Sequence, residues 1–126
     1  MPGHSYRGAL PPLSPAQSEL QSRLHQHIET LAGTISERNL DHYSALKAAA
    51  RYITEVFEEL GYQPVAHPYH VRSYLVQNIE ALKPGSAETD EIIVIGAHYD
   101  SGRGSPGAND NASGDRSPKT QSAAKQ

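Results

Sequence analysis

A histidine and two aspartates in the second half of the chain have the residue types and spacing of a metal site. His98 and Asp100 stand two residues apart, and Asp110 follows ten residues after Asp100 across a glycine-rich loop. A neutral imidazole binds divalent zinc well, and a nearby carboxylate can hold the other ring nitrogen and fix the orientation of the ring. This pattern indicates His98 and Asp110 as metal ligands, with Asp110 able to bridge two ions, and Asp100 as the partner of His98.

The residues before His98 predict the element that positions it. Ile92–Ile95 is a continuous apolar run of the kind found in strands buried on both faces, and Gly96 and Ala97 follow it. In open α/β sheets, ligands bind at the carboxyl ends of the strands, where His98 would lie. The alternative is an ordinary surface loop with a histidine and Asp-Asn turns, since a single His-x-Asp pattern is weakly specific.

Two amphipathic helices are predicted upstream. Ser14, Pro15 and Gln17 form a capping-box signature that starts the first helix, and Gly33 is expected to end it. Its apolar stripe consists of Leu20, Leu24, Ile28 and Leu31. The second helix is expected from about Asp41 to Leu60, with Gly61 as its stop. The linker between the helices contains Glu37, Arg38 and Asn39, polar groups suited to tying a loop to neighbouring elements.

Strands are expected after the second helix. Gln63–Val71 contains two prolines, which suits an edge strand, and Ser73–Leu82 alternates between apolar and polar residues. Arg72-Ser73 can join them as a hairpin, and Lys83–Asp90 is a turn that leads into Ile92–Ile95. Helices, a hairpin and a buried strand in this order predict an α/β fold.

Four other histidines are expected to have structural or solvent-exposed roles. His25 and His27 lie two residues apart on a helix, where their side chains point about 200° apart and cannot easily share one ion. His67 and His70 fall on the predicted edge strand, where surface positions are expected.

Composition narrows the classes of partner. The chain has 126 residues, a formal net charge of -3 and no cysteine, which excludes disulfides and thiolate metal sites and favours neither nucleic acid nor an anionic membrane as partner. The amino terminus lacks the apolar core of a signal peptide, and no apolar run approaches a membrane span. A soluble, cytoplasmic protein is the default expectation.

Several motifs together resemble the co-catalytic zinc aminopeptidase family, which includes bacterial leucyl aminopeptidases, glutamate carboxypeptidase and the related glutaminyl cyclases. The resemblance spans Leu20 to Gly114. Its motifs, in the order that the family shows, are LAGTISERN (31–39), AAARYI (48–53), LGY (60–62), QNIEA (77–81), GAHYDS (96–101) and SPGANDNASG (105–114).

The resemblance implies roles for the three candidate residues. His98 would be a terminal ligand of one zinc, Asp110 the carboxylate that bridges two zinc ions, and Asp100 the catalytic-site residue that orients His98. It also implies a cis peptide bond at Asp110-Asn111. The implied fold is the N-terminal part of a three-layer α/β/α zinc-peptidase domain with a mixed, mostly parallel central sheet.

The chain departs from the family after Ser113-Gly114. Relatives continue into an apolar helix and then supply a Glu-Glu pair, an Asp and a His, whereas this chain reads DRSPKTQSAAKQ. The catalytic Glu and the remaining ligands have no counterpart. We therefore expect residues 1–13 to be a flexible arm, 14–114 a truncated peptidase-like domain and 115–126 a disordered tail.

The function implied by the resemblance is zinc-dependent removal of amino-terminal residues from peptides, with this chain inactive alone. One alternative is a fragment of a glutaminyl-cyclase-like aminoacyltransferase, which uses a single zinc. Another is a non-catalytic interaction fragment that self-associates through an open sheet edge beside Ile92–Ile95. Family members are often secreted or periplasmic, which stands against the cytoplasmic default.

Overall fold

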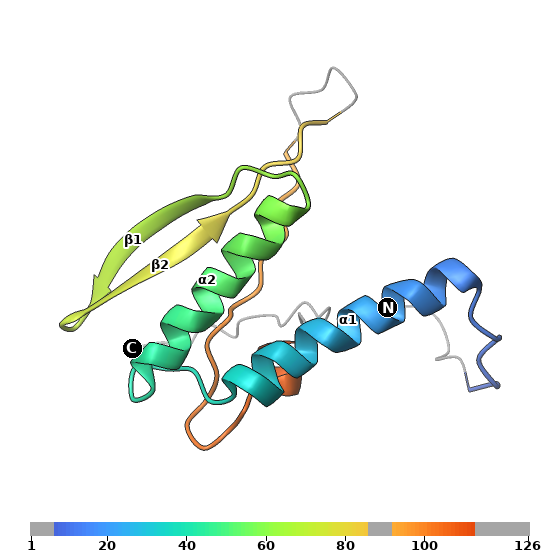
Figure 1. The fold of residues 1–126 in the computed structure, drawn as a ribbon, viewed down its shortest axis with the longest axis horizontal. Coiled ribbons are helices and arrows are strands. Elements are labelled where there is room, and N and C mark those ends of the chain that lie inside the picture. Colours follow the sequence, from blue (N-terminus) through green and yellow to red (C-terminus); the bar gives the residue numbers. More distant parts are fainter. Residues whose placement is uncertain (1–6, 86–91, 113–126) are drawn as a thin grey trace, which may run out of the picture.

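The computed structural model describes residues 7–85 and 92–112. The described chain has two long helices, two short π-helical turns and one antiparallel hairpin (Figure 1). In chain order these elements are α1 (Pro15–Ile28), η1 (Glu29–Ile35), α2 (Tyr43–Glu59), β1 (Val65–Val71), β2 (Tyr74–Glu80) and η2 (Ala108–Ala112). The turn η1 continues α1 directly and contacts both α2 and η2, and α2 packs against β2.

The start of α1 is the predicted capping box. The Gln17 backbone N–H donates to Ser14 Oγ at 3.3 Å, and the Ser14 backbone N–H donates to Gln17 Oε1 at 2.8 Å. The predicted end at Gly33 is wrong, because the helical path continues as η1 and ends at Ser36, whose φ is 66°. The Ser36 N–H reaches back to the Leu31 carbonyl at 3.0 Å, which closes the wider turn.

The apolar stripe of α1 is covered only near its carboxyl end. Leu31 in η1 is buried, whereas Leu20 and Leu24 are about half exposed. Figure 1 shows the amino-terminal part of α1 extending away from α2 and the hairpin. Periodicity therefore identified the helix correctly, but among the described residues only the last part of the stripe reaches a core.

The second helix and its end agree closely with the prediction. Leu46, Ala49 and Ala50 form its buried face. Gly61 takes a φ of 83°, its N–H donates to the Glu58 carbonyl, and the next N–H, that of Tyr62, donates to the Phe57 carbonyl. These two bonds are the Schellman pattern, in which a left-handed glycine satisfies the last helical carbonyls.

The predicted hairpin is confirmed. Val71 pairs with Tyr74 across the two-residue turn Arg72-Ser73, and Arg72 takes the positive φ, 56°, that short hairpin turns require. The hairpin is tied to the start of α2, because the Tyr43 hydroxyl donates to the Leu75 carbonyl at 2.6 Å and its ring lies 4.9 Å from that of Tyr74.

The predicted buried strand at Ile92–Ile95 is wrong. These residues form no strand, and their exposed fractions are 84, 88, 86 and 94%. The described chain is α/β in content, but its one sheet is the antiparallel pair β1-β2, so the predicted three-layer arrangement with a mostly parallel sheet is not present in it. An apolar run predicts a buried strand only if other strands and helices surround it, and the described residues do not surround this one.

The predicted terminal segments fall largely outside the described residues. Residues 7–13 are exposed and have no regular secondary structure, while residues 1–6 and the predicted tail 115–126 lie outside the described ranges. Within residues 7–85 and 92–112, no helix is long and apolar enough to cross a membrane.

Replacing the N-cap serine tests the start of α1. We expect Ser14→Ala to cost about 1 kcal/mol of helix stability, because the Gln17 N–H loses its acceptor, and Ser14→Gly to cost only about a few tenths. Hydrogen exchange at the Gln17 and Ser18 amides measures the difference. Equal exchange in wild type and Ser14→Ala would show that the cap does not stabilise the helix.

Candidate metal centre

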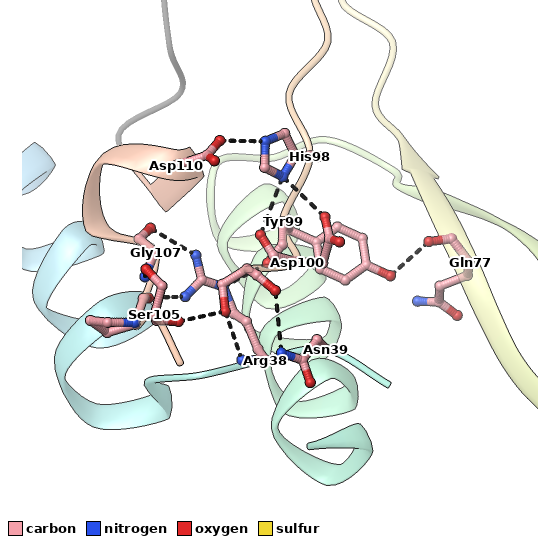
Figure 2. Close-up of polar contacts among 11 residues, drawn as sticks. Arg38, Asn39, Gln77, His98, Tyr99, Asp100, Ser105, Gly107 and Asp110 are labelled. Carbon is pink, nitrogen blue, oxygen red and sulfur yellow. Dashed lines mark hydrogen bonds and ion pairs between the residues drawn. The ribbon is translucent and has the colours of Figure 1, made fainter. Parts of the chain in front are cut away.

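The structure brings the three predicted site residues together around the His98 ring. His98 Nδ1 lies 3.0 Å from Asp100 Oδ1 and 3.2 Å from the Asp100 carbonyl oxygen, and His98 Nε2 lies 3.0 Å from Asp110 Oδ1 (Figure 2). All three side chains are at least half exposed. Each ring nitrogen therefore faces a different carboxylate, in a position open to solvent.

The backbone around Asp110 turns its carboxylate toward the histidine. Asp110 lies in η2, where its φ and ψ of -132° and 81° and those of Asn111, -139° and 50°, are not helical. The Asp110-Asn111 peptide bond is cis, as the resemblance implies. The Ala112 N–H donates to the Gly107 carbonyl at 2.9 Å and closes the turn that presents Asp110.

Gly107 is a position that only glycine fits. Its φ is 64°, and a Cβ there would lie 2.6 Å from Ser101 Cβ, 2.8 Å from the Asp110 carbonyl oxygen and 3.3 Å from Arg38 Nη2. Gly104, in the same loop, also has a positive φ, 71°, but a Cβ added there would meet nothing within 4 Å. Close packing at Gly107 therefore holds η2 against the segment that carries His98.

The centre of this packing is the fully buried side chain of Arg38. Its guanidinium donates to carbonyl oxygens in two parts of the chain that lie far from each other in the sequence. In η1 and its end these are the carbonyls of Leu31 at 3.0 Å and Ser36 at 3.1 Å. In the site segment they are the carbonyls of Tyr99 at 2.6 Å, Pro106 at 2.6 Å and Gly107 at 3.2 Å.

The backbone of Arg38 is bound to the same segment. Its N–H donates to Ser101 Oγ at 3.1 Å, and its carbonyl accepts from the Ser101 N–H at 2.8 Å. The hydroxyl of Ser101, which is also buried, donates to the Ser105 carbonyl at 2.9 Å. Ser101 thus connects the backbone of Arg38 to the loop that follows Asp100 in the sequence.

Glu37 and Asn39, on either side of Arg38, form hydrogen bonds with the exposed part of this loop. The Glu37 carboxylate accepts from Asn39 Nδ2 and from the Gly104 N–H, both at 2.9 Å, and Asn39 Nδ2 also reaches the Ser101 carbonyl at 3.3 Å. The two hydrogen bonds to Glu37 lower the pKa of its carboxyl group, and the bond from Asn39 has the larger effect. Arg103 forms an ion pair with Asp41 at 2.6 Å between Nε and Oδ2.

Burial has opposite consequences for two neighbouring groups. It lowers the pKa of Arg38, and the negative charge of Asp100 acts against that shift. Burial raises the pKa of Tyr99, whose hydroxyl donates to the Gln77 carbonyl at 2.7 Å and so ties the site segment to β2. Arginine keeps its charge under such conditions, so the buried cation interacts electrostatically with the carboxylate that faces His98.

The sequence indicated some of these contacts and not others. The polar run at 37–39 was predicted to tie a loop to its neighbours, and it does so. The roles of Ser101 and Gly107 were not predicted, because an SxxxS spacing and a loop glycine are too common to single out. Two other histidines have partners elsewhere, since His27 Nδ1 is 2.7 Å from the Tyr52 hydroxyl and His67 Nε2 is 2.9 Å from Glu80 Oε2 across the hairpin. His42 Nδ1 lies 3.4 Å from Glu37 Oε1, at the rim of the site loop.

The distance between the two candidate ligand atoms can be compared with the separation expected for two ligands of zinc. His98 Nε2 and Asp110 Oδ1 face each other, and two ligands of one tetrahedral zinc ion lie about 3.3 Å apart, given bonds of about 2.0–2.2 Å. The observed 3.0 Å is close to that separation. Among the described residues there is no cluster of three or more side chains that could hold a metal ion.

Residues 78–116 match peptidase family M28. The matched segment contains His98, Asp100 and Asp110 and most of QNIEA, and it confirms the resemblance there, while LAGTISERN, AAARYI and LGY lie outside it. Family M28 uses zinc, which agrees with the chemistry of the ligand pair. No curated protein and no solved structure matches the chain.

Two glycines with the same backbone conformation separate strain from steric clash. Gly104→Ala is expected to cost about 1–2 kcal/mol, from the left-handed backbone alone. Gly107→Ala adds a clash with Ser101 and the Asp110 backbone and is expected to cost clearly more. Urea unfolding of both variants measures this difference. Equal losses would show that the close approach at Gly107 is not maintained in solution.

Replacing the buried arginine tests the hub of the site. Arg38→Lys keeps the charge but loses the planar fork, leaving several buried carbonyls without a donor, so we expect a loss of about 3 kcal/mol or more in unfolding free energy. Arg51→Lys on the exposed face of α2 is the matched control and should change stability by less than about 0.5 kcal/mol. Similar losses in the two variants would contradict the assigned role.

Proposed function

We propose that this chain carries the first ligand pair of a zinc-dependent exopeptidase that removes amino-terminal residues from peptides. In this proposal His98 is a terminal ligand of one zinc ion, Asp110 is the bridging carboxylate and Asp100 orients His98. The observation that carries the proposal is the arrangement of His98 between the two carboxylates, with Nε2 directed at Asp110 and Nδ1 at Asp100. The match of residues 78–116 to family M28 supports peptide substrates.

The two carboxylates have different tasks because they face different nitrogens. An acceptor at Nδ1 favours the tautomer with its proton on that atom, which leaves the lone pair of Nε2 for a metal ion. Asp110 Oδ1 faces Nε2 at 3.0 Å, and a zinc ion would take the place of the proton shared between these two atoms. Asp100 therefore sets the ring orientation and increases the basicity of the ligand without needing to touch the ion.

Zinc, when bound, supplies a Lewis acid that activates water and stabilises the oxygen of the peptide carbonyl during hydrolysis. The described residues contribute the ligand pair and its support. Arg38 and Gly107 hold the segment of Asp110 against that of His98, so the spacing between the two ligands is set before any ion binds. The three-layer fold of the proposal would require further strands beside Ile92–Ile95.

Zinc titration of the full chain tests the ligand assignment without relying on activity. We expect His98→Ala and Asp110→Ala each to weaken Zn²⁺ binding, measured by calorimetry, by more than about 100-fold, and Asp100→Asn to weaken it by about 10- to 100-fold. His25→Ala is the matched control, because His25 is an exposed histidine on α1 that is not one of the three candidate site residues. Its affinity should equal that of wild type.

The same titration can contradict the assignment. If His98→Ala and His25→Ala bind zinc equally well, the ligand pair is not the site. If Asp100→Asn weakens binding as much as Asp110→Ala, Asp100 is a ligand and not an orienting residue. Circular dichroism of each variant checks that the helices are retained.

A further inference from the structure

The most exposed apolar segment in the described chain lies directly before the candidate metal centre. Ile92–Ile95 consists of four consecutive β-branched residues, each at least 84% exposed. Such residues favour extended strands, and large apolar side chains left in water mark an interaction surface. The segment contains no proline and no charge, so its backbone N–H and C=O groups can all take part in strand pairing.

We propose that copies of this chain associate by antiparallel pairing of Ile92–Ile95 with the same segment of a second copy. This inference does not depend on the proposed zinc site. A pair centred between Ile93 and Val94 places Ile92 opposite Ile95 of the second copy and brings uncharged β-branched side chains together. Cross-strand pairs of this kind stabilise a sheet.

Charge favours the antiparallel orientation. In the sequence Asp90 and Glu91 directly precede the segment, and Asp100 follows five residues after Ile95. A parallel, in-register pair would place the Asp100 carboxylates of two copies beside each other. The antiparallel pair places them at opposite ends, and it relates the two chains by a two-fold axis, as in most homodimers.

The size of the segment indicates how association proceeds. Stable interfaces use about 20–30 residues on each side, and four residues form a much smaller contact. A strand has two hydrogen-bonding edges, however, and both are open in an unpaired segment. A first pair therefore leaves an edge that a third copy can join, so we infer assembly that grows with concentration and does not stop at the dimer. The free edge of β1 is less suited to this, since Pro68 lacks an N–H.

Sedimentation velocity of the full chain, with a chelator present to exclude bridging by metal ions, tests the proposal. Over a dilution series from about 1 to 100 µM we expect concentration-dependent association. Val94→Lys should raise the concentration needed for half-association by at least about tenfold, because each pair would bury two like charges. Leu10→Lys is the matched control, since Leu10 is also an exposed apolar residue, at 82%. This variant should shift the concentration for half-association by less than about twofold.

A second pair of variants distinguishes strand pairing from general hydrophobic contact. Neighbouring N–H groups point to opposite edges of a strand, so Ile93→Pro and Val94→Pro each remove a donor from one edge while keeping an apolar side chain. Each should stop growth beyond small species, whereas Val94→Leu should associate as wild type does. The substituted positions are exposed, so circular dichroism should show the helices unchanged.

Three outcomes would overturn the inference. A monomer at every concentration excludes self-association. Equal shifts for Val94→Lys and Leu10→Lys show that association does not use this segment. Wild-type growth in both proline variants shows that the contact is not strand pairing.

Discussion

The buried guanidinium of Arg38 is the interaction on which the rest of the described structure depends. It joins the end of the first helical region to the segment that carries the candidate site, although more than 60 residues separate them in sequence. Bringing a cation out of water is costly unless its donors are satisfied, and here five carbonyl oxygens accept from them. The planar fork of arginine can address several acceptors at fixed angles, which the single ammonium of lysine cannot.

This arrangement explains why two exposed side chains, His98 and Asp110, can have a defined spacing. His98 and Asp110 are both open to solvent, so their own surroundings constrain them little. The backbone near them, by contrast, is fixed by Arg38. The carbonyls of Tyr99 and Gly107 accept from its guanidinium, and Ser101 is hydrogen-bonded to its backbone. In the proposed metal site, these buried groups would preorganise the ligands without touching the ion.

Local signals predicted local structure well. The capping box at Ser14, the glycine end at Gly61 and the two-residue turn at Arg72 are each determined by a few neighbouring residues, and all are present. The grouping of His98 with both aspartates also followed from short-range spacing together with the resemblance. The burial of Ile92–Ile95 did not follow, because burial depends on what surrounds a segment and not on its own composition. Three of the five carbonyl partners of Arg38, those of Tyr99, Pro106 and Gly107, come from distant backbone, which leaves no pattern in the sequence.

The described part of the chain has only a small apolar core. Its buried apolar residues are Leu31, Leu46, Ala49 and Ala50, two of which are alanines, whereas Ile92–Ile95 remains in water. Apolar burial is the main favourable term in folding, so a chain that leaves four large β-branched residues exposed has substantial free energy still to gain from a partner strand. The site segment is therefore fixed at its carboxyl end by Arg38 and unpaired at its amino end. A second copy that pairs with Ile92–Ile95 would constrain the backbone that leads into His98, so the proposed association would be physically linked to the spacing of His98 and Asp110.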